Sequence, residues 1–362
     1  MPKKKIAVLT GGGDAPGLNA VIYALTRTCI TKYGYELIGY KFGYRGLYNN
    51  DYIPLTLQNT SGILHKGGTI LYSSNKDNLF DYWIEENGVR VRRDVSDVAV
   101  ENLRREGVDA LCILGGDGTL ASAWNFARKG VNIVGIPKTI DNDLAATDIT
   151  FGFDTAVNIV TENLGRLHTT AESHHRVMVV EVMGRSAGWI ALNSGIAGSA
   201  DVILIPEIPF TLDGIIKKIN ERTAMGSPFT VVVVTEGASL AGQETVVGKI
   251  VEDSFDPVRF GGIGAMLAEL LEQRIEKEVR SVALGHIQRG GETSAADRVL
   301  SCRYGVAAAG LVHEQKYGNM VCLRDGKMSY VGLDYIAGKV KQVDPMGELV
   351  EVARSLGISF GE

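Results

Sequence analysis

Cysteine is scarce in this sequence, and basic residues form no cluster. The four cysteines lie far apart and without CxxC spacing: Cys29, Cys112, Cys302 and Cys322. This pattern indicates neither a zinc site nor a disulfide framework, so we expect reduced thiols. The net charge of −5, without a run of basic residues, argues against a nucleic-acid partner and against a membrane partner. An anionic ligand must therefore be held by a local arrangement of groups.

A long apolar segment is also missing. The longest stretch without a charged residue, residues 186–200, is interrupted by Gly and Ser and is too short to span a bilayer. The N-terminus, MPKKKIAVLT, leads directly into an expected strand and shows no targeting segment. We therefore expect a soluble, cytoplasmic protein.

The sequence does contain a repeated alternation of short apolar runs and longer periodic segments. The runs are KKIAVLT, DALCILG, VNIVGIP, RVMVVEV, FTVVVVTE and SVALGH. Between two of them, residues 96–106 begin with Ser, keep apolar residues at helical spacing and end before Gly107, which predicts a helix. Such alternation is typical of a parallel sheet with crossover helices. With 362 residues, 45% of them hydrophobic, the chain is expected to form two such lobes.

Glycines gather just after several of these runs, where α/β proteins bind ligands. In LTGGGDAPGLNAVI, residues 9–22, bare backbone N–H groups can approach a phosphate, although a tight turn without a ligand explains the same residues. The stretch lacks both the Walker and the dinucleotide patterns. In ILGGDGTL, residues 113–120, a carboxylate stands among glycines, which favours an Mg²⁺ carried by a polyphosphate.

The stretch GIPKTIDNDL, residues 135–144, places a lysine and two aspartates directly after an apolar run. One acidic or amide side chain, Asn142 or Asp143, is explained as a helix cap. A second cap is not needed. Asp141, beside Thr139 and Lys138, fits better as a base for a hydroxyl that meets a phosphoryl group.

Four arginines and one histidine lie in or near the later apolar runs. They lie in or near EVMGRSAG (181–188), VTEGA (234–238) and RSVALGHIQRGG (280–291), and include Arg176, Arg185, Arg280, Arg289 and His286. Solvated arginines at strand ends are the simpler interpretation. So many of them beside glycines in an acidic protein nevertheless favour recognition of a sugar phosphate.

Taken in order, TGGGDAPGLNA, GGDGT, PKTIDND, MGR, TEG and LGHIQRGG resemble the phosphofructokinase family, from about Lys5 to about Gly305. The resemblance implies transfer of a phosphoryl group from ATP, with Mg²⁺, to the 1-hydroxyl of fructose 6-phosphate in glycolysis. It implies a fold of two Rossmann-like parallel-sheet lobes with the active site in the cleft between them. The nucleotide lobe would comprise residues 1–151 and 288–337, and the sugar-phosphate lobe residues 152–287 and 338–362.

The resemblance also implies roles for individual residues. Asp141 matches the general base, Thr139 and Asp143 its supporting positions, and Asp117 the carboxylate for Mg²⁺. The nucleotide side would comprise Gly12, Gly118, Thr119, Lys138 and Tyr40. The sugar-phosphate pocket would comprise Met183, Gly184, Arg185, Glu236, His286 and Arg289. Arg176 and Arg280 match arginines that reach the 6-phosphate from a neighbouring subunit, so a homodimer or homotetramer is expected.

The choice of phosphoryl donor depends on two positions. Relatives that use pyrophosphate carry Asp in place of Gly118, where a carboxylate would crowd and repel the α-phosphate of ATP. Lys138 is typical of pyrophosphate users, which makes a reversible pyrophosphate-dependent enzyme the first alternative. We give Gly118 more weight, because a clash cannot be avoided whereas a flexible lysine can swing aside.

The segment GGTILYSSNK, residues 67–76, departs from the pattern of the family. Tyr72 replaces a glycine, and Asn75 replaces an arginine that bridges the donor and acceptor phosphates. We expect Lys76 to substitute for that charge; otherwise the chain would be a weak enzyme or a non-catalytic sugar-phosphate-binding paralogue.

A second departure concerns regulation. Three positions that carry basic residues for effector phosphates in allosteric relatives are Tyr23, Met225 and Ser227 here, while Arg27 remains. Control by ADP or phosphoenolpyruvate is therefore not expected.

Overall fold

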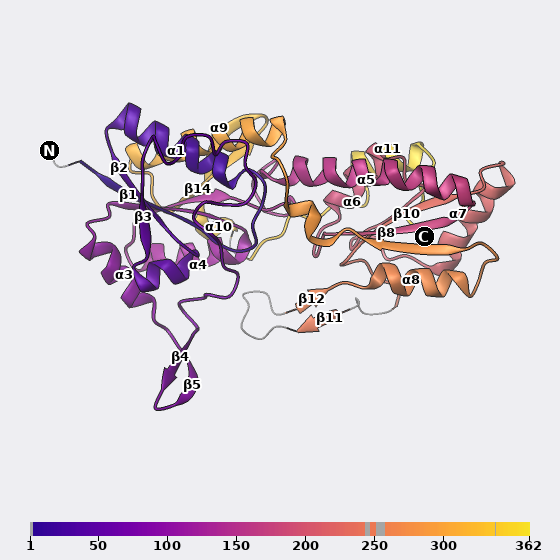
Figure 1. The fold of residues 1–362 in the computed structure, drawn as a ribbon, viewed down its shortest axis with the longest axis horizontal. Coiled ribbons are helices and arrows are strands. Elements are labelled where there is room, and N and C mark those ends of the chain that lie inside the picture. Colours follow the sequence, from indigo (N-terminus) through magenta and orange to yellow (C-terminus); the bar gives the residue numbers. More distant parts are fainter. Residues whose placement is uncertain (1–2, 243–246, 251–257, 337) are drawn as a thin grey trace.

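The computed structural model describes residues 3–242, 247–250, 258–336 and 338–362, and these form two α/β lobes side by side (Figure 1). The first sheet has 7 strands in the order β15-β14-β7-β6-β1-β2-β3. Its strands are β1 (Lys5–Thr10), β2 (Glu36–Tyr40), β3 (Tyr52–Leu55), β6 (Ala110–Gly115), β7 (Ile133–Pro137), β14 (Asn319–Arg324) and β15 (Lys327–Gly332). The five central strands are parallel, and β3 and β15 are antiparallel edges.

Helices cover both faces of this sheet, which is why its strands are almost uniformly apolar. One face carries α1 (Leu18–Tyr33) and α9 (Ala295–His313). The other carries α2 (Tyr44–Asn49), α3 (Ser96–Arg105), α4 (Asp117–Arg128) and α10 (Leu333–Ile336). The helix predicted for residues 96–106 is confirmed as α3, and it ends before Gly107, whose φ is +65°.

The second sheet has 4 parallel strands in the order β13-β8-β10-β9. They are β8 (Val177–Val182), β9 (Val202–Leu204), β10 (Thr230–Thr235) and β13 (Val279–Ala283). One face carries α5 (Phe153–His174), α6 (Trp189–Ala197) and α11 (Glu348–Ser355). The other face carries α7 (Leu212–Ala224) and α8 (Ile263–Glu272). The predicted pair of parallel-sheet lobes is thus confirmed.

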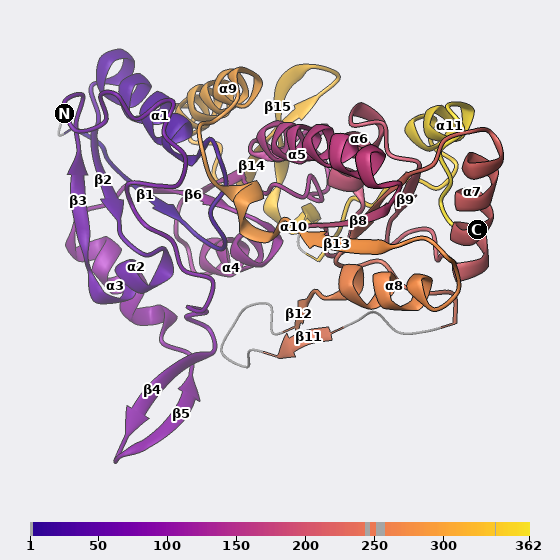
Figure 2. The same ribbon diagram turned by 45° about the vertical axis from the view of Figure 1, so that its right-hand side comes forward.

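The chain passes between the two sheets more than once. It leaves the first sheet after β7, returns after β13 through the 3-10 helix η1 (Gly285–Arg289), and leaves again after α10. The boundaries of the predicted lobes stay a prediction. Two hairpins lie outside the sheets, β4 (Tyr82–Glu86) with β5 (Val89–Arg93) and β11 (Val247–Ile250) with β12 (Val258–Phe260). The first of them projects from the lobe that contains the first sheet (Figure 2).

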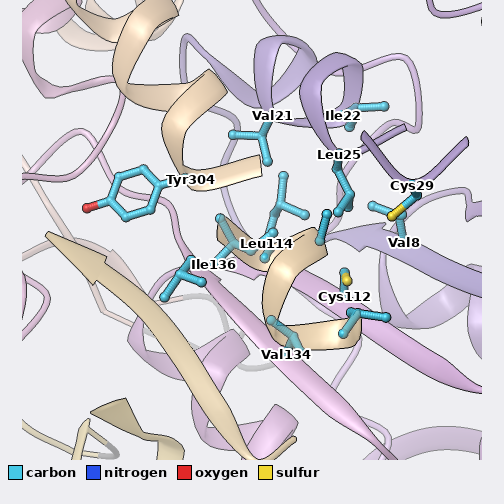
Figure 3. Close-up of a cluster of buried hydrophobic side chains, with 14 of the residues drawn as sticks. Val8, Val21, Ile22, Leu25, Cys29, Cys112, Leu114, Val134, Ile136 and Tyr304 are labelled. Atoms are coloured by element: carbon cyan, nitrogen blue, oxygen red, sulfur yellow. The ribbon is translucent and has the colours of Figure 1, made fainter. Parts of the chain in front are cut away.

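The core between α1, α9 and the first sheet contains two of the cysteines (Figure 3). Cys29 and Cys112 pack among Val8, Leu25 and Val134, and all four thiols of the chain are free. Burial raises the pKa of the Cys29 thiol to about 12, so this thiol is a poor nucleophile. No helix within the described ranges is long and apolar enough to cross a membrane.

Candidate active site

The predicted motifs meet at the carboxyl ends of neighbouring strands. In the first sheet, residues 11–13 follow β1, residues 116–118 follow β6 and residues 138–143 follow β7, and these three strands are adjacent. In the second sheet, Met183 follows β8 and Glu236 follows β10, again on adjacent strands. Carboxyl ends of parallel strands share one edge of a sheet, so the motifs of each sheet share one edge.

The loop after β1 needs glycines because other groups approach it closely. The Gly12 N–H donates to the Ser74 carbonyl at 2.9 Å, and the Ser73 hydroxyl donates to the Gly12 carbonyl. Gly12 has a φ of +78°, a conformation that favours glycine. A Cβ atom at Gly11 would lie 2.6 Å from Cγ2 of Thr119. The loop is therefore packed between the segment around Ser74 and the start of α4.

Lys138 is enclosed beside this loop. Its side chain is 4% exposed, and Nζ donates to the Gly13 carbonyl at 2.5 Å. Burial lowers the pKa of the Lys138 ammonium to about 8, and the positive charge of Arg289 acts in the same direction. Lys138 is thus enclosed by the surrounding loops, whereas the sequence suggests a flexible side chain.

Asp141 is half-buried, and one of its carboxylate oxygens, Oδ1, is buried without a hydrogen-bond partner in the described residues. Burial raises the pKa of the Asp141 carboxyl, and the charge of Glu236 raises it further, while Arg289 and Lys138 oppose both effects. The Asp141 N–H donates to the Thr139 hydroxyl at 3.1 Å. Since buried polar atoms are nearly always paired, an unpaired carboxylate oxygen here is poised to accept a proton from a bound hydroxyl.

Asp143 has a similar environment. Burial raises the pKa of its carboxyl to about 7, with added repulsion from the charges of Asp141 and Asp117. Asn142, between the two aspartates, adopts a left-handed φ of 53°. The next helix, α5, begins only at Phe153, so the interpretation of Asn142 or Asp143 as a helix cap is wrong.

The sugar-phosphate candidates lie at the carboxyl end of the second sheet. Gly184 has a φ of +134°, and a Cβ atom there would lie 2.9 Å from the Ala187 carbonyl oxygen. Arg185 and Glu236 are half-buried, and burial raises the pKa of the Glu236 carboxyl. His286 lies in η1 and is exposed.

Arg289 connects the two sets of residues. It ends η1, and its Nη1 donates to the Asp14 carbonyl at 2.8 Å, in the loop after β1. Its charge lowers the pKa of the Asp141 and Glu236 carboxyls and that of the Lys138 ammonium. The positive charge of Arg289 thus acts both on the predicted base, Asp141, and on Glu236 of the predicted sugar pocket.

Two predicted substrate arginines lie away from these residues. Arg176 directly precedes β8, whereas Met183 directly follows it, and β8 has 6 residues, so these ends are about 20 Å apart. Arg280 pairs in register with Met178 at the same starting end. Both arginines form ion pairs with Glu278. Within one chain, the structure does not bring them to the pocket at Met183.

One predicted nucleotide contact needs correction. Tyr40 ends β2 and is 0% exposed; its hydroxyl donates to Asn50 Oδ1 at 3.3 Å and its ring packs edge-on against Tyr52. A side chain without exposed area cannot contact a nucleotide, so Tyr40 is a core residue. The Thr119 side chain is also buried, against Gly11 and Gly115, and supports the loops rather than facing solvent.

The segment that departs from the expected pattern lies beside the loop after β1. Tyr72 is 54% exposed, has a φ of 57° and stacks on Phe42 with ring centroids 4.8 Å apart. Asn75 and Lys76 are exposed, directly after the Ser74 carbonyl that binds Gly12. Lys76 therefore lies on the predicted donor side of the site.

Known proteins are similar to this chain in sequence and in fold. The family model described as phosphofructokinase matches residues 5–312. An ATP-dependent 6-phosphofructokinase 2 of Clostridium perfringens is 65% identical, over 100% of this chain and 99% of that protein. A pyrophosphate–fructose 6-phosphate 1-phosphotransferase of Amycolatopsis methanolica is 47% identical, over 94% of this chain and 96% of that protein.

The fold is found in solved structures as well. Phosphofructokinase from Saccharomyces cerevisiae superposes with a TM-score of 0.79 at 30% identity, over 92% of this chain and 45% of the yeast chain. This chain thus spans less than half of the yeast chain, while it matches the bacterial relatives over nearly their whole length. The chain belongs to the phosphofructokinase family.

Proposed function

We propose that this protein is an ATP-dependent 6-phosphofructokinase, which transfers a phosphoryl group to the 1-hydroxyl of fructose 6-phosphate. The observation that carries the proposal is the unpaired, buried carboxylate oxygen of Asp141, set between the glycine loops of the first sheet and the charge of Arg289. Asp141 takes the proton of the hydroxyl, and the glycine loops after β1 and β6 hold the donor phosphates. The product would be fructose 1,6-bisphosphate, and we infer that the reaction belongs to glycolysis and takes place in the cytoplasm.

The residues present fit a Mg²⁺ ion that arrives with the nucleotide. Asp117 is exposed at the start of α4, and its charge acts on Asp143. A single carboxylate beside a glycine turn suits Mg²⁺, since this ion is usually held by one or two carboxylates and by phosphate oxygens. Asp117 would hold the ion, which would neutralise charge on the transferred phosphoryl group when bound.

The identity of the donor rests on Gly118 and on the relatives. Because Lys138 is held in place, it counts for the pyrophosphate alternative more strongly than the sequence argument allowed. Against this, the relative at 65% identity is named as ATP-dependent, whereas the pyrophosphate enzyme is 47% identical. Gly118, in the first turn of α4, adds no charge beside Asp117. We therefore retain ATP as the donor, with pyrophosphate as the alternative.

Asn75 stands where the family has an arginine, so a non-catalytic role is the second alternative. A sugar-phosphate-binding paralogue would bind fructose 6-phosphate without turnover. We propose instead that Lys76 supplies the positive charge that the family places at position 75. The assay is formation of fructose 1,6-bisphosphate by the unmodified protein; binding without turnover would favour the paralogue.

The positions of Arg176 and Arg280 support a site shared between subunits. They lie at the opposite end of β8 from Met183, too far for their side chains to reach a sugar phosphate bound there. We infer that they reach that phosphate from a second copy of the chain, and both form ion pairs with Glu278. We therefore propose a homodimer or a homotetramer as the active form.

Subunit mixing tests this arrangement. Asp141→Asn should be inactive, and Arg280→Ala should raise KM for fructose 6-phosphate by about 100-fold because a charged phosphate contact is lost. Dissociating and reassociating equal amounts should restore about a quarter of the sites, since about half of the dimers are hybrids with one intact site. Mixing Asp141→Asn with Arg185→Ala is the control and should restore nothing, because both residues belong to the same half of the site. Equal recovery in both mixtures would contradict the shared site.

The acidic environment of the base predicts an unusual pH dependence. Burial raises the pKa of both the Asp141 and the Asp143 carboxyls, so kcat should fall as the pH falls and the base becomes protonated, with a midpoint above the usual range of an exposed carboxyl. Asp143→Asn removes a negative neighbour, which lowers the pKa of Asp141, so the midpoint should move to lower pH. The measurement is kcat against pH for both proteins. A midpoint that moves upward in Asp143→Asn would contradict the prediction.

A further inference from the structure

The segment of residues 340–343, which we call the strap, runs against the loop that carries the predicted base. Val340 forms a β-bridge with Leu144. The Lys341 N–H donates to the Asp143 carbonyl at 2.7 Å. The strap thus pairs through its backbone with the chain immediately after Asp141.

The other side of the strap is bonded to the sugar-phosphate lobe. The Trp189 Nε1–H donates to the Lys341 carbonyl at 2.8 Å, and Gln342 Nε2 donates to the Ser186 carbonyl at 3.2 Å. The Val343 N–H donates to Glu207 at 2.8 Å. Ser186 directly follows Arg185 of the predicted sugar pocket. The strap therefore bridges the loop of the base and the loop of the sugar pocket.

The Lys341 ammonium uses all of its protons on the loop of the base. It donates to Asn142 Oδ1 at 2.9 Å, to the Thr147 carbonyl at 3.0 Å and to the Asp148 carbonyl at 2.9 Å. An ammonium has three donors and no acceptor, so these bonds exhaust its capacity. The Trp189 ring lies 5.6 Å from Nζ. The ammonium thus binds only neutral oxygens, and these bonds hold the loop in its shape.

Asn142 shapes this loop, because its backbone adopts the left-handed conformation, which Asn tolerates better than most other non-glycine residues. Its φ is 53°, and Asp141 and Asp143 lie on either side of it. The Asn142 Oδ1 accepts from the Thr150 N–H at 3.1 Å as well as from Lys341. These two donors hold the turn that aims the neighbouring carboxylates.

We propose that Lys341 is a positioning residue for phosphoryl transfer, which holds Asp141 in register with the sugar pocket through Asn142. The proposal rests on the proposed function of Asp141 as the base. Positioning affects the transition state more than binding, because small displacements of a catalytic group cost rate steeply. Loss of the ammonium should therefore lower kcat and leave the Michaelis constants nearly unchanged.

The test compares Lys341→Met with Lys339→Met, the same substitution two residues earlier on the chain. Lys339 is exposed, and its Nζ lies 3.6 Å from the centroid of the Tyr335 ring. We expect kcat of Lys341→Met to fall by about 10-fold to 100-fold, with KM for fructose 6-phosphate and for ATP within about 3-fold. Lys339→Met should behave as the unmodified protein does.

Lys341→Arg, which keeps the charge, is measured in parallel and carries the test if Lys341→Met does not fold. Its planar fork cannot reproduce three converging bonds, so its kcat should also fall while both KM values stay unchanged. An unaltered kcat in the folded variant, or a loss expressed only in KM, would overturn the inference. If the unmodified protein itself shows no turnover, the proposed function fails instead, and the two outcomes are distinct.

Discussion

Replacing Asp141 by Asn is expected to lower kcat by about 1,000-fold while binding of fructose 6-phosphate and ATP is kept. General-base catalysis contributes about 100-fold to 10,000-fold, and Asn has the shape of Asp without its basicity. The raised pKa of the Asp141 carboxyl and its unpaired Oδ1 are both consistent with a base that waits for a hydroxyl. The measurement is kcat from initial rates together with dissociation constants from calorimetry.

The matched control is Asp148→Asn, on the same loop. Its side chain is exposed, and its backbone carbonyl accepts from Lys341. Its carboxylate accepts from the Gly326 N–H at 3.3 Å, a bond that the amide oxygen of Asn can also accept. This variant should keep nearly full activity. An Asp141→Asn variant with unchanged kcat, or one that loses binding and rate together, would contradict the role assigned to Asp141.

The second large effect is expected from Gly118→Asp. The new carboxylate would stand in the first turn of α4, one residue from Asp117, and would repel the α-phosphate of ATP. Like charges a few ångströms apart near a protein surface repel by a few kcal/mol, so kcat/KM for ATP should fall by about 100-fold or more. Any activity with pyrophosphate should fall far less, since pyrophosphate has no α-phosphate with an attached nucleoside.

Gly118→Ala separates charge from size at this position. The methyl group adds no charge, so ATP use should stay much closer to that of the unmodified protein. Similar losses for Gly118→Ala and Gly118→Asp would point to crowding of the α4 start. Equal losses with ATP and pyrophosphate in Gly118→Asp would show that this position does not choose the donor.

The sequence predicted the strand ends well because local patterns determine them. Apolar runs followed by glycines mark the carboxyl ends of parallel strands, and this brought Gly12, Asp117 and Asp141 to one edge of a sheet. Family membership was predicted from the same motifs and is confirmed by the relatives.

Predictions from the sequence are wrong or missing where the direction of a side chain, or a contact between distant residues, determines the surroundings of a group. Tyr40 stands at a strand end like the glycine motifs, yet its ring points into the core. The enclosure of Lys138 depends on Gly13, 125 residues away along the chain, so no local pattern indicates it. Lys341 follows no motif, and its partner Asn142 is 199 residues distant, so only the folded chain reveals the bond. Long-range packing of polar groups leaves no periodic signal in a sequence.

The most direct test of the central claim is the initial rate with fructose 6-phosphate and Mg²⁺, with ATP and pyrophosphate supplied separately at matched concentrations. The account predicts turnover with ATP and little with pyrophosphate, which would leave Gly118 as the determinant of donor choice. Turnover with pyrophosphate alone would contradict it and assign that choice to the enclosed Lys138. No turnover with either donor, together with binding of fructose 6-phosphate, would contradict the proposed activity altogether.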